Sequence, residues 1–232
     1  MENQTHEHTG EHHKTDEHQK GKKRSQEAIE RYVQIGFILL LSLAIIFNLG
    51  KIYGGDNTGI ISSVAASDIL PIGVPAVYGK ALDVSYDDVS VANPQLADAT
   101  IAKLAQYEDQ ELTKVQLDRY ITIASAISCE YCCGAKSIIF PNGERACGCA
   151  HSFAMRGLAK YLLINNPEMK DEEILAELGK WKVLFFPGIH EQKAKVLEAQ
   201  GIDSTDYINL ASNKYRGIEQ GKTNGGAMVG GC

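Results

Sequence analysis

Residues 129–151 hold the feature that most constrains this chain, a concentration of soft metal ligands. The segment contains five of the six cysteines and one of the seven histidines. A C-x2-C step is followed, after fourteen residues, by a C-x-C-x-H step. Thiolate sulfur and neutral imidazole nitrogen are preferred by zinc, copper and iron–sulfur clusters. The sequence therefore predicts a metal site with six candidate ligands: Cys129, Cys132, Cys133, Cys147, Cys149 and His151.

The residues between the two steps predict a chain reversal. Residues 138–140 favour a strand, and the sequence Pro-Asn-Gly-Glu at 141–144 is a strong turn signal. A short β-hairpin here would bring the second step back against the first. Residues 152–164 then have a helical pattern, which places His151 near the first turn of a helix.

This order of hook, hairpin and helix start resembles the treble-clef or ribbon type of metal site. The resemblance covers about a tenth of the chain. Such sites usually offer two C-x2-C pairs, whereas this segment has a C-x-C second half and adjacent cysteines at 132 and 133. We take the architecture as an analogy and carry over no function from it.

Two other readings of the cysteines stay open. The first is a pair of disulfides in a stapled scaffold or interaction domain, in which Cys232 could pair the odd cysteine and adjacent Cys132 and Cys133 could bridge only with strain. The second is a thiol–disulfide oxidoreductase that uses Cys129 and Cys132. It ranks third because the alternating strand–helix pattern usual around such a pair is missing.

Further soft donors lie outside the segment. Met155 follows His151 by four residues and so shares a helix face with it, although packing in the core explains Met155 equally well. Met228 and Cys232 lie in a glycine-rich tail, where they could fold back on the cluster. A histidine-rich arm could also chelate metal weakly, through His6, His8, His12, His13 and His18.

A hydrophobic run separates that arm from the rest of the chain. Residues 33–49 carry no charge, and with both flanking residues the run approaches the roughly 20 residues that a membrane-spanning helix needs. Basic residues are concentrated before the run, while only Lys51 lies close behind it. The sequence thus predicts a single-pass anchor in the cell membrane, with a cytoplasmic N-terminus and an extracytoplasmic C-terminal domain. A prepilin-like filament subunit is a minor alternative.

The domain organisation follows from these features and from the helical periodicity. We expect a mainly α fold, in which the transmembrane helix is followed by a small helical domain with one β-hairpin inside the cysteine segment. The expected parts are a disordered tail at 1–31, the transmembrane helix at 32–50, a linker and extended arm at 51–92, the helical domain at 93–217 and a flexible tail at 218–232.

Composition and motifs narrow the function. The formal net charge of −6 argues against nucleic acid as the main partner. The chain has no phosphate-binding glycine loop, no G-x-S-x-G and no H-E-x-x-H motif, which favours a protein that is not an enzyme. His190, near the start of a helix expected over 189–200, reads as a surface residue rather than a ligand. The sequence predicts a membrane-anchored metal-binding protein for metal handling or electron transfer, with a metal-donor or redox protein as its partner.

Overall fold

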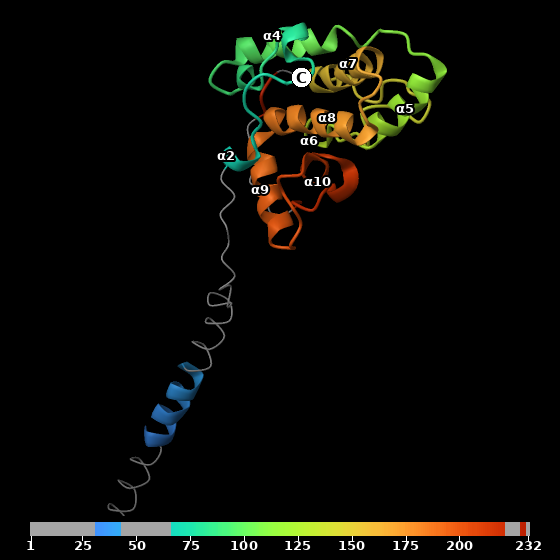
Figure 1. Ribbon diagram of the computed structural model, residues 1–232. Coiled ribbons are helices and arrows are strands. Elements are labelled where there is room, and N and C mark those ends of the chain that lie inside the picture. The colour runs from blue at the N-terminus through green and yellow to red at the C-terminus, as the bar shows by residue number, and fades with distance from the viewer. Residues whose placement is uncertain (1–30, 43–65, 221–227, 231–232) are drawn as a thin grey trace, which may run out of the picture. The chain divides into compact units, whose positions relative to one another are not determined.

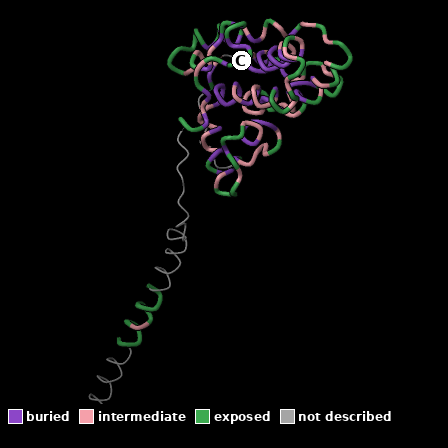
Figure 2. The backbone as a smooth tube through the Cα atoms, in the orientation of Figure 1, coloured by how far each residue is buried: buried purple, intermediate pink, exposed green. Residues whose placement is uncertain are grey.

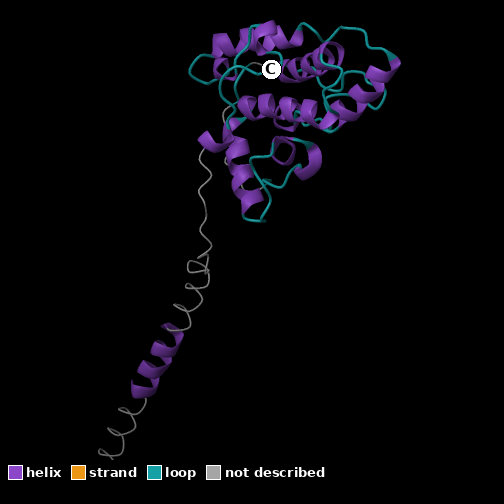
Figure 3. Ribbon diagram, in the orientation of Figure 1, coloured by secondary structure: helices purple, strands orange, loops and turns teal. Residues whose placement is uncertain are grey.

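The computed structural model describes residues 31–42, 66–220 and 228–230. The chain divides into two units, residues 1–61 and 62–232, and each is described by itself. The described residues are mainly helical, as Figures 1 and 3 show. Besides the helix over 31–42, the elements are α2 (Ala66–Ile69), α3 (Gly79–Leu82), η1 (Tyr86–Asp88), α4 (Pro94–Ala105), α5 (Lys114–Ser125), α6 (Glu130–Cys133), α7 (Ala150–Asn165), α8 (Asp171–Phe185), α9 (Pro187–Glu198), α10 (Tyr207–Ala211) and η2 (Asn213–Tyr215).

The helix over 31–42 corrects the prediction of a membrane anchor. Residues 43–50 of the predicted span lie outside the described ranges. Within those ranges no helix combines the length and the apolar character that crossing a bilayer requires. The prediction of a transmembrane helix, and of the localisation based on it, is therefore corrected, because the described helix does not meet the length and apolar character that a membrane span requires.

Local capping signals explain where the main helices begin. The Asn93 side chain accepts a hydrogen bond from the Leu96 N–H at 3.2 Å, and Pro94 occupies the first position of α4. Thr113 and Gln116 form a capping box at the start of α5. Three acidic residues occupy the first turn of α8, where they complement the helix dipole.

The larger core lies among α4, α5, α7 and α8. Helix α7 packs against the other three, and Figure 2 shows α7 and α8 largely buried. The Trp181 ring is fully buried, and its indole N–H donates to the Tyr78 hydroxyl at 2.6 Å. Gly157 lets α7 approach α4, because a Cβ there would collide with the Leu104 carbonyl. This core holds α7, which carries part of the cysteine segment.

A smaller core joins α8 to α9 and α10. Its buried members include Val183, Leu197 and Leu210. Helix α10 is separated from η2 at Ser212, which is extended and whose hydroxyl caps η2 by accepting a hydrogen bond from the Lys214 N–H. The short helices α10 and η2 follow α9, and α10 packs against α8.

The cysteine segment reverses direction, but no β-hairpin forms in the part of the chain that the structure describes. One isolated antiparallel bridge joins Ile139 to Arg145, and Gly143 takes a positive φ of 87° in the turn. The carbonyls of Ile138 and Cys147 accept hydrogen bonds from Arg156 Nη1, both at 2.9 Å. Backbone hydrogen bonds across the reversal run from Phe140 N–H to the Glu144 carbonyl and from Ala146 N–H to the Ile138 carbonyl, so the pairing stays confined to the residues beside the turn. The predicted reversal is present, but the predicted hairpin is wrong.

Candidate metal centre

Four of the six predicted ligands converge at the junction of α6 and α7. Cys129 is the N-cap of α6 and Cys132 lies within this helix, while Cys149 is the N-cap of α7 and His151 lies in its first turn. Their ligand atoms all lie within 4.8 Å of one another. Sulfur atoms on a tetrahedral zinc ion are about 3.8 Å apart, given a Zn–S bond of about 2.3 Å. This Cys3His group could therefore hold one metal ion after small side-chain movements.

Buried contacts hold α6, which carries two of these ligands. The Lys182 ammonium on α8 is fully buried and pairs with the Glu130 carboxylate at 2.8 Å. Glu130 also accepts a hydrogen bond from the Ser128 hydroxyl at 2.6 Å. Gly134 ends α6 in the left-handed conformation, with φ of 70°. The ion pair therefore fixes the short turn between Cys129 and Cys132.

The His151 ring is oriented by the far end of the described chain. Its Nε2 lies 2.7 Å from the Val229 carbonyl oxygen, so Nε2 carries the proton and donates it. Nδ1 is then the nitrogen with a free lone pair, and this buried atom has no hydrogen-bond partner among the described residues. Metal-ligating histidines commonly donate their other ring N–H to a backbone carbonyl. The ring therefore has the tautomer and the orientation that a metal ligand needs.

The Cys149 sulfur occupies an electropositive position. As N-cap of α7 it accepts a hydrogen bond from the Ser152 N–H at 3.4 Å, and its Sγ lies 3.3 Å from the Cys129 Sγ. The Cys129 thiol can donate a hydrogen bond to the Cys149 sulfur. This hydrogen bond lowers the pKa of Cys149 to about 3, although burial acts in the opposite direction. The same hydrogen bond, with burial, raises the pKa of Cys129. One thiolate is thus already favoured in the group.

The remaining cysteines of the segment are oxidised. Cys133 and Cys147 form a disulfide across a sequence separation of 14. Cys132 is also disulfide-bonded, whereas Cys129 and Cys149 are free thiols. The Cys147 Sγ lies 3.4 Å from the Cys149 Sγ, so the disulfide adjoins the Cys3His group. The predicted Cys129–Cys132 redox pair is not formed.

The other predicted ligands divide into three groups. Met155 is buried in the larger core, with 1% of its surface exposed. Met228 is 40% exposed. The remaining candidates lie outside the described residues: Cys232, His6, His8, His12, His13 and His18.

A charged cluster beside the site was missed in the sequence. We use this name for Glu130, Lys182, His190, Lys193 and Glu219; the last four are buried, and the Glu130 side chain is 6% exposed. His190, read as a surface residue, is fully buried, and its Nδ1 lies 2.9 Å from the Phe186 carbonyl. Periodicity alone could not find this cluster, because its members come from α6, α8, α9 and the segment after η2.

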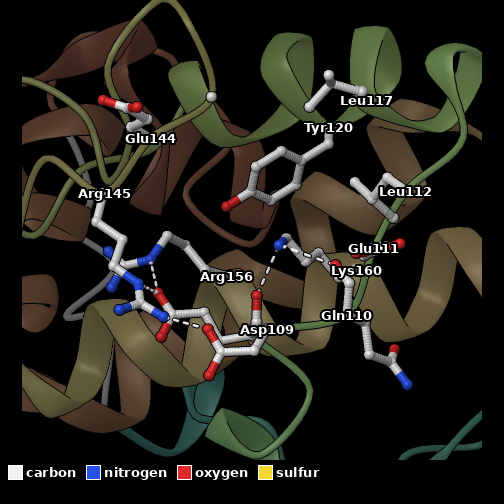
Figure 4. A pocket seen from close by; sticks show the side chains of 12 residues that line it. Asp109, Gln110, Glu111, Leu112, Leu117, Tyr120, Glu144, Arg145, Arg156 and Lys160 are labelled. Carbon is white, nitrogen blue, oxygen red and sulfur yellow. Dashed lines mark hydrogen bonds and ion pairs between the residues drawn. The ribbon is translucent and has the colours of Figure 1, made fainter.

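A separate pocket of about 710 Å³ lies beside the turn at Gly143 and Glu144 (Figure 4). Arg145 and Arg156 both pair there with the Glu108 carboxylate, and the Tyr120 hydroxyl points into the pocket. None of the four Cys3His residues lines it. Arg156 links this pocket to the cysteine segment through its hydrogen bond to the Cys147 carbonyl.

Comparisons with protein-family models, with curated proteins and with solved structures find no match to this chain. The function is therefore argued from the site alone.

Proposed function

We propose that this chain binds one Zn²⁺ ion through Cys129, Cys132, Cys149 and His151, and that the ion stabilises the junction of α6 and α7. Two observations carry the proposal: three sulfur atoms and one ring nitrogen of His151 lie within 4.8 Å of one another, and the buried His151 Nδ1 has no hydrogen-bond partner among the described residues. A buried polar atom without a partner costs about 1–3 kcal/mol, and a bound ion would remove that cost. Three sulfurs and one imidazole make a closed set, which is typical of structural zinc.

The proposed ligand set makes metal binding depend on redox state. A sulfur binds metal as a thiolate, and Cys132 is disulfide-bonded here. The reduced chain is therefore the form that binds with all four ligands. Because Cys149 is the favoured thiolate, this ligand need lose no proton on binding.

The first experiment measures metal binding by the full chain. The protein is reduced without oxygen, freed of metal by a chelator and titrated with Zn²⁺, and bound metal is counted by mass spectrometry. We expect one ion per chain. Titration with Co²⁺ should give the intense visible absorption of a tetrahedral thiolate site, whereas copper or iron retained at purification would change the metal but not the ligands.

Matched cysteine variants locate the site. Loss of a residue that only orients a metal ligand typically weakens metal binding 10- to 100-fold. Because Cys149→Ser removes a proposed ligand itself, it should weaken binding by more than about 100-fold. Cys133→Ser removes a cysteine outside the proposed set and should retain affinity within a few-fold. Equal effects of the two substitutions, or no binding by the reduced chain, would refute the proposal.

A second candidate function is a disulfide-stapled interaction domain without metal. The Cys133–Cys147 disulfide supports it directly. Closing a loop of this size stabilises a folded chain by about 3 kcal/mol in the chain-entropy model. The same titration separates the two candidates, because a purely stapled domain would bind no metal and would lose stability on reduction whether or not zinc is present.

A further inference from the structure

Four described sulfur atoms form a continuous series. The disulfide joins Cys133 to Cys147, the Sγ atoms of Cys147 and Cys149 are 3.4 Å apart, and those of Cys149 and Cys129 are 3.3 Å apart. Each free thiol in the series therefore lies in contact with the next sulfur. Thiol–disulfide exchange needs this contact, because a thiolate attacks one sulfur of a disulfide directly.

The two ends of the series differ in exposure. Cys133 is exposed, whereas Cys147, Cys149 and Cys129 are buried. A small thiol from solution can therefore approach the disulfide at Cys133, while attack on Cys147 is open to the internal neighbour Cys149. The series connects the protein surface to two of the proposed metal ligands.

We infer that the disulfide migrates along this series, from Cys133–Cys147 to Cys129–Cys149, and that this migration switches the metal site off. The inference rests on the proposed function for its consequence, but not for its chemistry. It assigns to the segment an exchange activity whose entry point for small thiols is Cys133.

The exchange balances without an external oxidant. The Cys149 thiolate attacks the Cys147 Sγ, the Cys133–Cys147 bond breaks, and Cys133 leaves as a thiolate. Cys129 then loses its proton to solvent, and its thiolate attacks the Cys149 Sγ. The Cys147–Cys149 bond breaks, and Cys147 leaves as a thiolate. These four sulfur atoms make up one disulfide and two thiols both before and after the exchange, and protons are exchanged with solvent.

The two disulfide isomers differ in what they can bind. With Cys132 reduced, the Cys133–Cys147 isomer keeps all four proposed ligands available to an ion, whereas the Cys129–Cys149 isomer consumes two of them. Zinc at about 100 times its Kd should therefore favour the first isomer by about 100-fold through mass action. Loss of metal would permit migration, and return of metal would reverse it.

Trapping of Cys133 tests the first step. The metal-free full chain is incubated in its oxidised form with N-ethylmaleimide and without added thiol. We expect alkylation of Cys133 while Cys147 remains oxidised, at a rate independent of protein concentration. Cys129→Ser should retain this labelling, because only the second step needs Cys129, whereas Cys149→Ser should lose it. Equal labelling of wild type and Cys149→Ser, or no labelling of wild type, would overturn the inference.

Peptide mapping tests the second step. Cleavage after Glu130 and Lys136 places Cys129 and Cys133 on different peptides, so the two disulfides give linked products of different mass. In a glutathione redox buffer, zinc should reduce the ratio of the Cys129-linked to the Cys133-linked product by about 100-fold at 100 times its Kd. An unchanged ratio in a chain that binds zinc overturns the switch alone. Cys133 trapping in a chain that binds no zinc overturns the proposed function and leaves the exchange intact.

Discussion

The Cys3His group and the charged cluster both include residues of the short helix α6, and each contains at least one buried polar atom without a hydrogen-bond partner among the described residues. In the Cys3His group that atom is His151 Nδ1, and the group's four ligand atoms converge within 4.8 Å. In the charged cluster the atoms without a partner include Lys193 Nζ, His190 Nε2 and Glu219 Oε2, which differ in charge. A cation would meet two ammonium groups there, at Lys182 and Lys193. Convergence of compatible donors, rather than the number of unpaired atoms, marks a metal site.

The two regions also share one element. Glu130 pairs with Lys182 in the charged cluster, and it lies next to Cys129 in the chain. The ion pair therefore supports the metal ligands without contributing a ligand itself. Changes to each region separately should reveal how strongly α6 couples them.

The largest effect is expected from breaking the ion pair. Lys182→Met leaves the Glu130 carboxylate buried without its counter-ion, which should cost about 3–5 kcal/mol of the free energy of unfolding. Urea unfolding measures the loss. Combining it with Glu130→Gln should recover part of the loss, because the uncompensated charge is removed. Lys180→Met, which breaks the partly exposed Glu177 pair, is the control and should cost about 1 kcal/mol or less.

Metal loading should give the next largest effect. Zinc at 100 times its Kd should stabilise the reduced chain by about 2.7 kcal/mol, provided that the unfolded chain does not bind it. Thermal unfolding with and without zinc measures this gain. Cys149→Ser should abolish it, whereas Lys193→Met should leave it unchanged. A gain retained by Cys149→Ser would place the ion elsewhere.

Lys193→Met should stabilise the chain at neutral pH. Burial, and then the charge of Lys182, lower the pKa of Lys193 to about 8, while Glu219 and Glu130 oppose this and Arg216 adds to it. The unfolded chain binds the proton below about 10.5, so the wild-type penalty grows as pH falls from 10.5 to 8 and is constant below that. The methionine variant should therefore gain about 2 kcal/mol at pH 7 and almost nothing above pH 10.5. Urea unfolding at both pH values measures the difference.

His190 should give the smallest effect. Burial, and then the charges of Lys182 and Lys193, lower the pKa of His190 to about 3. The unfolded chain takes up this proton below about pH 6.5 and the folded chain does not, so stability is full above 6.5 and falls as pH decreases toward 3. Between pH 7.5 and 5.5 we expect a loss of about 1.4 kcal/mol from this residue. His190→Gln should remove that part of the pH dependence, and an unchanged pH profile would contradict the assignment.

Local signals predicted much of the helical domain. The Asn93–Pro94 start of α4 and the acidic start of α8 depend on neighbours in the sequence, so they could be read directly. For the hydrophobic run over 33–49, the described residues contain no helix that is long and apolar enough to cross a membrane. The hairpin was misread, because the strand and turn signals predicted the reversal but not that its pairing would stop at one isolated bridge, between Ile139 and Arg145.

The sequence predicted the types of ligand in the candidate site, but not which of the six candidate residues come together. Spacing identified six ligands, yet nothing local distinguishes Cys132 from Cys133 or shows that Cys147 is oxidised. The acceptor that orients His151 is a backbone carbonyl, which no residue type reveals. The buried lysines were missed because their counter-charges come from other helices.

The hydrogen bond between His151 and the Val229 carbonyl joins residues 78 positions apart. A ribosome that has already made all four proposed ligands must therefore add 78 more residues before that acceptor exists. At about 5–20 residues per second this takes roughly 4 to 16 s. During that interval the nascent chain has its thiols in place, but the His151 imidazole is not yet oriented by Val229. Cellular metal and oxidants therefore compete for the cysteines before this hydrogen bond can form.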